Sequence, residues 1–423
     1  MKKIFFSIIM AAAPFISDAT DVLTLEACKQ MATENNISIK QATNDITASE
    51  EQMKQAYTNF FPTVSGNGTF YHSPNELVDI ELMGQHLKSG KNIYFFGVNA
   101  TMPLYAGGQI NNGYKLSKVG LEASKIEKLK ALRDIYIQTE KYYWQIAMLN
   151  EKMKTMDSAD SLLADVYKTA VNAVKNGLKN RNDLLKVELR QAENESSRLE
   201  LQNAIMVSKQ MLAQYIGRGD TDFTVSSDIN SYQLPDFPNS LKKDHMLAVN
   251  NMLEYQMLEK KIDANRLEIE MERGKCLPSL SVSAGYNYTK FWGEASGGAA
   301  IYATLQIPIS DWWGGSHAIQ NKKKKLENSQ LEQMNAHQML QIQLNKLWFN
   351  VEEAYKNLQI SLKSIGQAEE NLRLNRNAYQ FGTSTMTELL DAELLNRQAH
   401  NKYVDAYASY CTKIIEYIQM ITN

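Results

Sequence analysis

The sequence predicts a mostly α-helical chain that also carries membrane β-strands, with one long-helix-plus-β-hairpin unit written twice. Three observations predict this fold class. Short motifs recur in the same order in both halves, and within each half the hydrophobic periodicity changes from helical to alternating and back. Only 8 prolines and 21 glycines interrupt the 423 residues. Together these features favour long uninterrupted elements over a set of small globular domains.

Four landmarks recur with a nearly constant offset. They predict a first repeat at 20–217 and a second at 241–423, joined by a connector at 218–240. Chance would supply one such pair, but hardly four in the same order. The paired landmarks are Phe61-Pro62 with Leu277-Pro278, Met102-Pro103-Leu104 with Ile307-Pro308-Ile309, Gly107-Gly108 with Gly314-Gly315, and Asp183-Leu184-Leu185 with Glu388-Leu389-Leu390.

Each half opens with a helix and contains a long helical hairpin. Thr24 can cap a helix over about 24–60. The run from 109 to about 175 has no proline and an apolar stripe at intervals of three, four and seven, which is typical of helices packed as a coiled coil. At 1.5 Å per residue this helix spans roughly 100 Å. The chain then turns at Gly177 and returns as a helix of about half that length, over 182–216.

The alternating segments have one apolar face and one small, polar face. Leu280, Val282, Ala284 and Tyr286 share one face of a strand, with serines and a glycine on the other. Similar patterns from about Pro62, around Tyr94–Met102 and around Ile301–Ile309 give strands of about 10–12 residues. One such strand fits a soluble hairpin equally well. Four of them, in a chain without the ~18–20 apolar residues of a membrane helix, favour a transmembrane β-structure.

The first residues predict a secretory signal peptide at 1–19. Lys2 and Lys3 form a positive segment, and Ile4 to Phe15 form an apolar stretch too short to span a membrane. We expect cleavage near Ala19, with no lipid anchor because no cysteine follows it. The expected location is the outer membrane, with a helical domain in the periplasm.

Four membrane strands per chain require an oligomer, because about eight strands is the minimum for closing a barrel in lipid. Three subunits with two hairpins each would supply twelve strands, enough for an open lumen. The helices that follow the strands would then surround the same axis. The sequence therefore predicts a trimeric β-barrel continued by a periplasmic α-helical barrel.

Composition excludes several classes of function. A net charge of −2 offers no basic surface for nucleic acid. Cys28, Cys276 and Cys411 are scattered, which argues against a disulfide framework or a metal site. The six histidines form no metal-binding pair, and no nucleophile elbow or phosphate-binding glycine loop is present. We therefore expect no enzyme activity and no cofactor.

An ordered set of motifs resembles the TolC-type outer-membrane efflux proteins across essentially the whole mature chain. The resemblance implies a trimer with a twelve-stranded barrel, a periplasmic helical tunnel, and partners that include a periplasmic membrane-fusion adaptor and an inner-membrane pump or exporter. The residues that carry it are Leu23-Thr24-Leu25-Glu26-Ala27, Glu34-Asn35-Asn36, Phe61-Pro62, Met102 to Gly108, Tyr379 to Thr383, and Glu388 to Ala392.

The resemblance also implies roles for residues at the helix turns. Gly177 and Gly382 would form the tip where the adaptor docks. Asp183 and Tyr379 match a gate that holds neighbouring coiled coils together, although the basic residue usual in that gate is replaced by Ser384. Glu388 and Asp391 match an acidic constriction at the periplasmic entrance, and a solvated helix face explains each of them as well.

The implied function is the exit duct of a tripartite efflux pump or a type I secretion system, for small molecules or peptides. The alternative is a trimeric coiled-coil surface or scaffold protein with a β-barrel anchor and no transport. One further motif is the run Lys322 to Lys325 beyond the second hairpin. It suits either anionic lipid headgroups or a solvated helix face.

Overall fold

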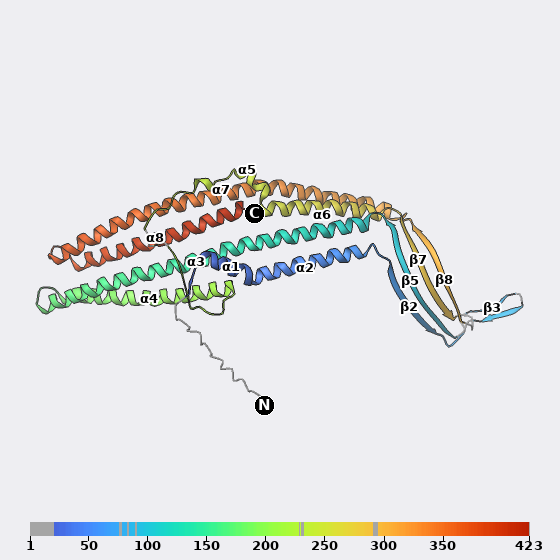
Figure 1. The fold of residues 1–423 in the computed structure, drawn as a ribbon, viewed down its shortest axis with the longest axis horizontal. Coiled ribbons are helices and arrows are strands. Elements are labelled where there is room, and N and C mark those ends of the chain that lie inside the picture. Colours follow the sequence, from blue (N-terminus) through green and yellow to red (C-terminus); the bar gives the residue numbers. More distant parts are fainter. Residues whose placement is uncertain are drawn as a thin grey trace, which may run out of the picture. The chain divides into compact units, whose positions relative to one another are not determined.

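The structure is a computed structural model that describes residues 21–75, 78–82, 84–88, 91–227, 229, 232–290 and 295–422. The expected signal peptide at 1–19 lies outside the described residues. The chain forms two compact units, whose helices and strands are labelled in Figure 1. The first combines the described parts of Met1–Asn36, Ile135–Phe237 and Asn350–Glu416, and the second combines those of Ile37–Asp134, Pro238–Phe349 and Tyr417–Asn423.

Long helical hairpins dominate the chain, which confirms the expected fold class. Helix α3 (Gln109–Lys175) has 67 residues and α7 (Asp311–Gln380) has 70. Each is followed by a 36-residue helix, α4 (Arg181–Ile216) and α8 (Met386–Ile421). None of the described helices has a stretch long and apolar enough to span a bilayer. The remaining α-helices are α1 (Leu25–Asn35), α2 (Ile37–Thr58), α5 (His245–Ala248) and α6 (Leu253–Lys275).

The opening helix expected over 24–60 is interrupted at Asn36. Thr24 caps α1 as expected, accepting a hydrogen bond from the Ala27 amide at 3.3 Å. The backbone of Asn36 is extended, with ψ of 134°, and α2 begins at the next residue. Its side-chain Nδ2 donates to the Tyr215 carbonyl at 3.0 Å near the end of α4. This long-range contact offsets the loss of helical hydrogen bonds at the break.

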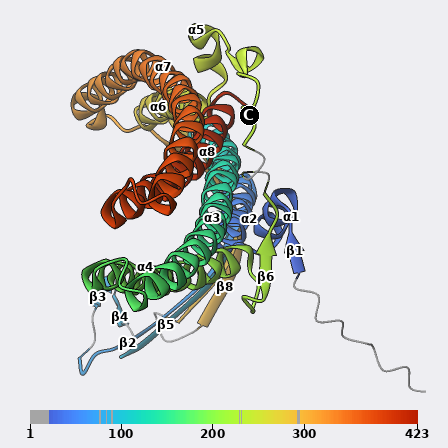
Figure 2. The same cartoon turned by 90° about the vertical axis from the view of Figure 1, so that its left-hand side faces the viewer.

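A short parallel pair of strands in the first unit was not anticipated. Strand β1 (Asp21–Leu23) pairs with β6 (Phe223–Val225), beside α1 (Figure 2). Phe223 is fully buried, and the hydroxyl of Tyr143 on α3 donates to the Ser226 carbonyl. Part of the segment after α4 is therefore held firmly against the long helix.

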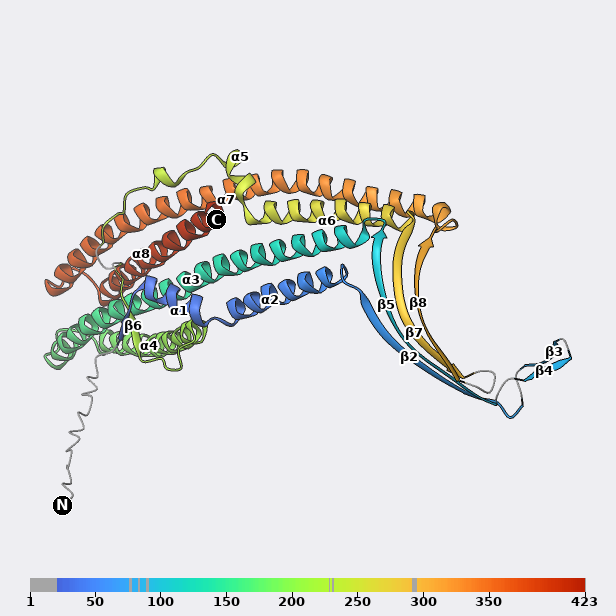
Figure 3. The same ribbon diagram turned by 45° about the vertical axis from the view of Figure 1, so that its right-hand side comes forward.

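The second unit contains a four-stranded antiparallel sheet in the order β2-β5-β7-β8 (Figures 1 and 3). Its strands are β2 (Thr63–His72), β5 (Asn92–Ala106), β7 (Ser279–Lys290) and β8 (Ala295–Gln306). The central pair, β5 with β7, joins the two halves of the sequence along twelve partnered residues. A smaller hairpin, β3 (Asp79–Leu82) with β4 (Gln85–Lys88), lies between β2 and β5 in the sequence and was not expected.

The register of the sheet places most of the large apolar side chains on one face. Phe96 is opposite Tyr288 and Val98 is opposite Tyr286, while on the other face Thr101 is opposite Ser283. The apolar side chains are the exposed ones, and Ile301 is 80% exposed. Ser283, on the polar face, is only 4% exposed and hydrogen-bonds to Thr101 at 2.9 Å. A sheet that folds in water alone would place its faces the other way round.

Glycines on the polar face make room for asparagines of the neighbouring strand. A Cβ on Gly97 would lie 2.4 Å from Asn287 Oδ1, and a Cβ on Gly285 would lie 2.0 Å from Asn99 Oδ1. These distances are far below van der Waals contact, so each amide occupies the space that a side chain would need. The two glycines are therefore required by packing between β5 and β7.

This packing predicts that Gly285→Val disrupts the sheet. The side chain would collide with Asn99, and overpacking of this kind costs roughly 1–3 kcal/mol. We expect a clear fall in the midpoint of urea unfolding and less assembled protein in the outer-membrane fraction. Gly298→Val is the matched control on the polar face of β8, since nothing lies within 4 Å of its added Cβ. Equal behaviour of the two variants would contradict the packing argument.

Candidate functional site

Two matching helix-to-helix turns form the first candidate site, and both lie in the first unit. Gly177 ends the turn after α3 with φ of 70°, and Gly382 ends the turn after α7 with φ of 76°. In each turn the residue after glycine donates back to the helix, from Leu178 to the Ala173 carbonyl at 2.8 Å and from Thr383 to the Ala378 carbonyl at 2.9 Å. These are Schellman bonds, which require a left-handed residue that glycine adopts without strain.

The acidic residues after the turns stand at the same position, third in the next helix. Asp183 follows the Asn180 cap of α4, while Glu388 follows Thr385 before α8. Glu388 Oε2 accepts from the Thr385 amide at 2.7 Å, and the Glu388 amide donates to Thr385 Oγ1 at 3.3 Å. This reciprocal pair is a capping box. Part of the reason for an acidic residue at 388 is therefore local helix chemistry.

The hydrogen bonds to Glu388 also stabilise its ionised form. The backbone N–H of Thr385, followed by the hydroxyls of Ser384 and Thr385, lowers the pKa of this exposed carboxyl. Asp391 is exposed one turn further along α8.

Tyr379 lies in an apolar cluster where all four long helices of the first unit meet. It is 7% exposed, and its hydroxyl has no hydrogen-bond partner. Burial, and then the negative charge of Asp183, raises the pKa of the Tyr379 phenol. No hydrogen bond therefore joins these two residues within the chain, although Asp183 lies close enough to act on the phenol. The other buried cluster members are Leu163, Val166, Ala170, Val187, Met386, Leu389 and Leu390.

Two lysines of the first hairpin contact the second hairpin at the turns. Lys179 Nζ lies 5.1 Å from the centre of the Tyr379 ring, a cation–π distance. Lys186 Nζ donates to Thr387 Oγ1 at 2.9 Å. Neither lysine stands out in the sequence, because each contact joins segments about 200 residues apart. Ser384, at the position where a basic residue is usual in the gate, contacts its own hairpin: its hydroxyl donates to Glu388 at 2.7 Å.

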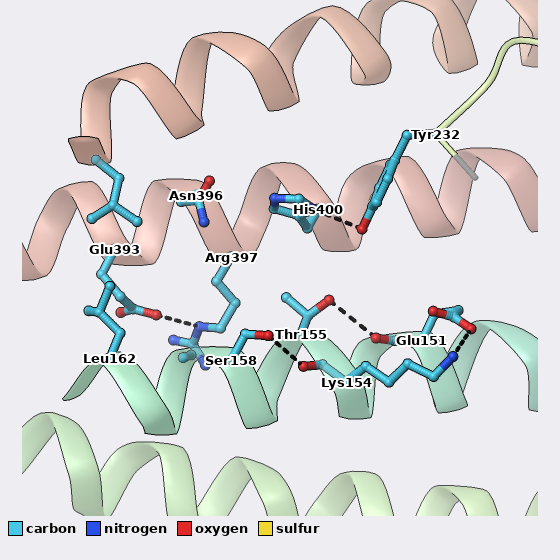
Figure 4. A pocket seen from close by; sticks show the side chains of 12 residues that line it. Glu151, Lys154, Thr155, Ser158, Leu162, Tyr232, Glu393, Asn396, Arg397 and His400 are labelled. Atoms are coloured by element: carbon cyan, nitrogen blue, oxygen red, sulfur yellow. Dashed lines mark hydrogen bonds and ion pairs between the residues drawn. The ribbon is translucent and has the colours of Figure 1, made fainter. Parts of the chain in front are cut away.

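A polar cavity of about 300 Å³ lies further along the same helices and was not foreseen (Figure 4). Tyr232 and His400 lie on one side of it, with the Tyr232 hydroxyl 3.0 Å from His400 Nδ1. Tyr232 is the only non-glycine residue with positive φ among the described residues. The cavity is lined by Glu151, Lys154, Thr155, Ser158, Ala159 and Leu162 from α3, by Leu372 from α7, and by Glu393, Asn396, Arg397 and His400 from α8, with Tyr232.

Glu393 is the most unusual group in this cavity. It is 3% exposed, and neither of its carboxylate oxygens has a hydrogen-bond partner. Its nearest counter-charge is Arg397, whose Nε lies 3.6 Å from Glu393 Oε1 (Figure 4). Burial raises the pKa of Glu393, and the charges of Arg397 and Arg190 only partly offset that effect. The ionised carboxylate therefore destabilises the fold at neutral pH.

The raised pKa predicts that Glu393→Gln stabilises the protein at neutral pH. A neutral amide avoids burying the charge, so the free energy of unfolding should increase at neutral pH. Because the folded-state pKa is raised, the gain should be full above that pKa and should vanish as pH falls below the ordinary pKa of glutamate. Unfolding by urea across a pH series measures it.

The matched control for this experiment is Glu151→Gln. Glu151 is also buried, but it forms an ion pair with Lys154 at 2.7 Å. Its replacement removes a paired charge and should give no gain. A loss of stability in Glu393→Gln at neutral pH would show that the pair with Arg397 outweighs the cost of burial.

The sequence matches the outer membrane efflux protein family over residues 29–218 and 247–417. The chain therefore belongs to the outer membrane efflux protein family, whose members are outer-membrane channels rather than enzymes. This membership, together with the exposed apolar sheet face and the helical hairpins, makes the chain an exit-channel subunit of the outer membrane.

Solved structures show the same fold at low sequence identity. CusC, described in terms of transmembrane channel formation, has a TM-score of 0.80 and 15% identity, with 94% of this chain and 91% of that chain covered. VceC, an outer membrane protein of Vibrio cholerae, has a TM-score of 0.73 and 16% identity, covering 94% and 95%. The Campylobacter jejuni outer membrane channel CmeC has a TM-score of 0.77 and 14% identity, covering 94% and 85%. No curated protein matches the sequence.

Proposed function

We propose that the chain works as a homotrimer that forms the exit duct of a tripartite efflux pump or a type I secretion system. The observation that carries this proposal is that the outer edges of β2 and β8 have no neighbouring strand among the described residues. Every residue of the edge strands β2 and β8 is exposed. Open backbone groups are not tolerated in lipid, so each edge needs a partner strand. Three copies of the four-stranded sheet would close one barrel of twelve strands.

The polar face of the sheet supports a water-filled lumen. In the four strands this face carries hydroxyls, amides, glycines and a few aromatic rings, and none of its residues is charged. A scaffold protein with a membrane anchor and no transport remains the second candidate. It needs no continuous polar lining, whereas a duct does, so the polar face favours the duct.

The exposed apolar residues at the turns suit an adaptor. Phe381 is 83% exposed and Leu178 is 75% exposed, next to Gly382 and Gly177. Exposed apolar side chains at the centre of an otherwise polar end are typical of docking surfaces. We assign this surface to the periplasmic adaptor, through which an inner-membrane pump or exporter would deliver cargo.

The gate is proposed to involve Tyr379 and Asp183, with a basic contribution from the first hairpin. The buried Tyr379 hydroxyl has no partner within the chain, so an acceptor on a neighbouring subunit would satisfy it. Lys179 and Lys186 would take the place of the basic residue that is absent at Ser384, since both already contact the second hairpin.

The gate proposal predicts that Tyr379→Phe combined with Asp183→Ala raises the conductance of the resting channel. A hydrogen bond to a charged group is worth roughly 1.5–3 kcal/mol. Loss of such a bond between subunits should therefore shift the equilibrium measurably from the closed towards the open channel. Planar-bilayer recordings test this in variants that still form trimers. Tyr167→Phe is the control, because Tyr167 packs against the same apolar cluster. Unchanged conductance in the double variant would place the lock elsewhere.

The duct proposal predicts a trimer in detergent that conducts ions and prefers cations. Asp391 and Glu388, one turn apart on α8, would form two acidic rings at the entrance. Light scattering corrected for detergent gives the subunit number, and the reversal potential in a salt gradient gives the selectivity. A trimer that passes no ions would favour the scaffold.

The selectivity is best tested with Glu388→Gln and Asp391→Asn together. Glutamine at 388 preserves the capping box while removing the charge, so helix α8 keeps its start. The reversal potential should move towards zero with assembly unchanged. An unchanged reversal potential would make both carboxylates part of a solvated helix face.

A further inference from the structure

The junction between the sheet and the long helices carries aromatic side chains from several strand ends. Trp312 and Trp313 start α7 and are 49% and 78% exposed. Phe61, before β2, and Tyr105, at the end of β5, are 51% and 49% exposed. The Trp312 Nε1–H donates to the Cys276 carbonyl at 2.8 Å, which orients that ring. Exposed aromatic rings at one level of a membrane sheet mark the bilayer interface.

Beyond Asp311, the first residue of α7, the two long helices that leave this junction carry only positive charge over their first turns. In α3 the residues from Gln109 to Leu121 include Lys115 and Lys118 and no acidic residue. In α7 the residues from Trp312 to Leu326 include Lys322 to Lys325 and no acidic residue. The same excess in both halves is not explained by helix stability, because the start of a helix favours acidic side chains.

Part of this charge is neutralised within the chain, and part is not. Lys322 pairs with Glu268 at 2.6 Å, and Lys324 pairs with Glu327 at 2.7 Å. Lys323 and Lys325 are exposed and have no acidic partner among the described residues. Lys115 is likewise exposed and unpaired there, and Lys118 contacts only the Tyr114 ring, at 4.6 Å.

Helix geometry brings these free ammonium groups close to the bilayer. Lys323 and Lys325 lie ten and twelve residues after Trp313, a rise of roughly 15 and 18 Å along α7. Helical side chains tilt towards the N-terminus of their helix, and α3 and α7 both begin where β5 and β8 end (Figure 3). Long lysine side chains extend further in that direction. The charges then lie within about one Debye length of the headgroups, where attraction is still effective.

We propose that Lys115, Lys118, Lys323 and Lys325 form a basic collar that binds anionic phospholipid headgroups of the leaflet next to the helices. The aromatic rings set the depth of the sheet, and the collar selects the charge of the surrounding lipid. The collar lies at the end of the strands that leads into the periplasmic helices. The lipid next to it is therefore that of the periplasmic leaflet, and the occupant is a phospholipid. This role is separate from conduction, so its failure would leave the duct proposal intact.

The test uses the assembled full-length protein in nanodiscs of equal parts phosphatidylcholine and phosphatidylglycerol. Lipid that stays bound during extraction is counted by native mass spectrometry. We expect enrichment of phosphatidylglycerol at low salt and its loss at high salt. Removing the charge of one lysine near a membrane surface should reduce the enrichment by up to about fivefold. Lys323→Gln with Lys325→Gln, and the same changes at Lys115 and Lys118, should therefore act cumulatively.

The matched control is Lys356→Gln with Lys363→Gln, two exposed lysines in the part of α7 that belongs to the first unit. Glutamine keeps helix propensity, so all variants should assemble. Unchanged phosphatidylglycerol enrichment in the variant lacking all four collar charges would overturn the proposal. An equal loss in the control would also overturn it.

Discussion

The hydrogen-bonding groups along the edges of one four-stranded sheet constrain everything else in this protein. The sheet exposes its apolar face and leaves β2 and β8 open along their whole length. Water disfavours the exposed face, and lipid disfavours the open edges. Only a closed barrel inside a bilayer satisfies both. The strand faces, the glycines opposite asparagines and the aromatic junction are all consistent with that one solution.

The helical hairpins show how one repeated pattern supports two different local environments. Both turns use a left-handed glycine and the same Schellman bonds. Asp183 and Glu388 occupy equivalent positions, yet Glu388 completes a capping box while Asp183 acts on the buried phenol of Tyr379. The difference arises from tertiary packing, since Tyr379 of the second hairpin inserts into a cluster that both hairpins build.

The first unit also retains polar groups and a backbone conformation that reduce its stability. Glu393 is buried without a hydrogen bond, and Tyr232, which lines the same cavity, holds a strained backbone with φ of 48°. Natural proteins keep such features where surrounding packing stabilises them. The cluster around Tyr379 and the β1–β6 pair lie in the same unit and provide that packing.

Local chemistry determined what could be predicted from the sequence alone. Helical periodicity predicted the 67 residues of α3, glycine predicted both turns, and strict alternation predicted which strand residues share a face. Long-range contacts decided the rest. The break at Asn36 depends on a hydrogen bond to Tyr215, and the pairing of β5 with β7 joins the two halves. The Tyr379 hydroxyl is buried without a hydrogen-bond partner, and Glu393 lines a cavity that no sequence motif predicted. Spacing along the chain encodes periodicity and turns, whereas burial and partner choice depend on residues that are distant in sequence.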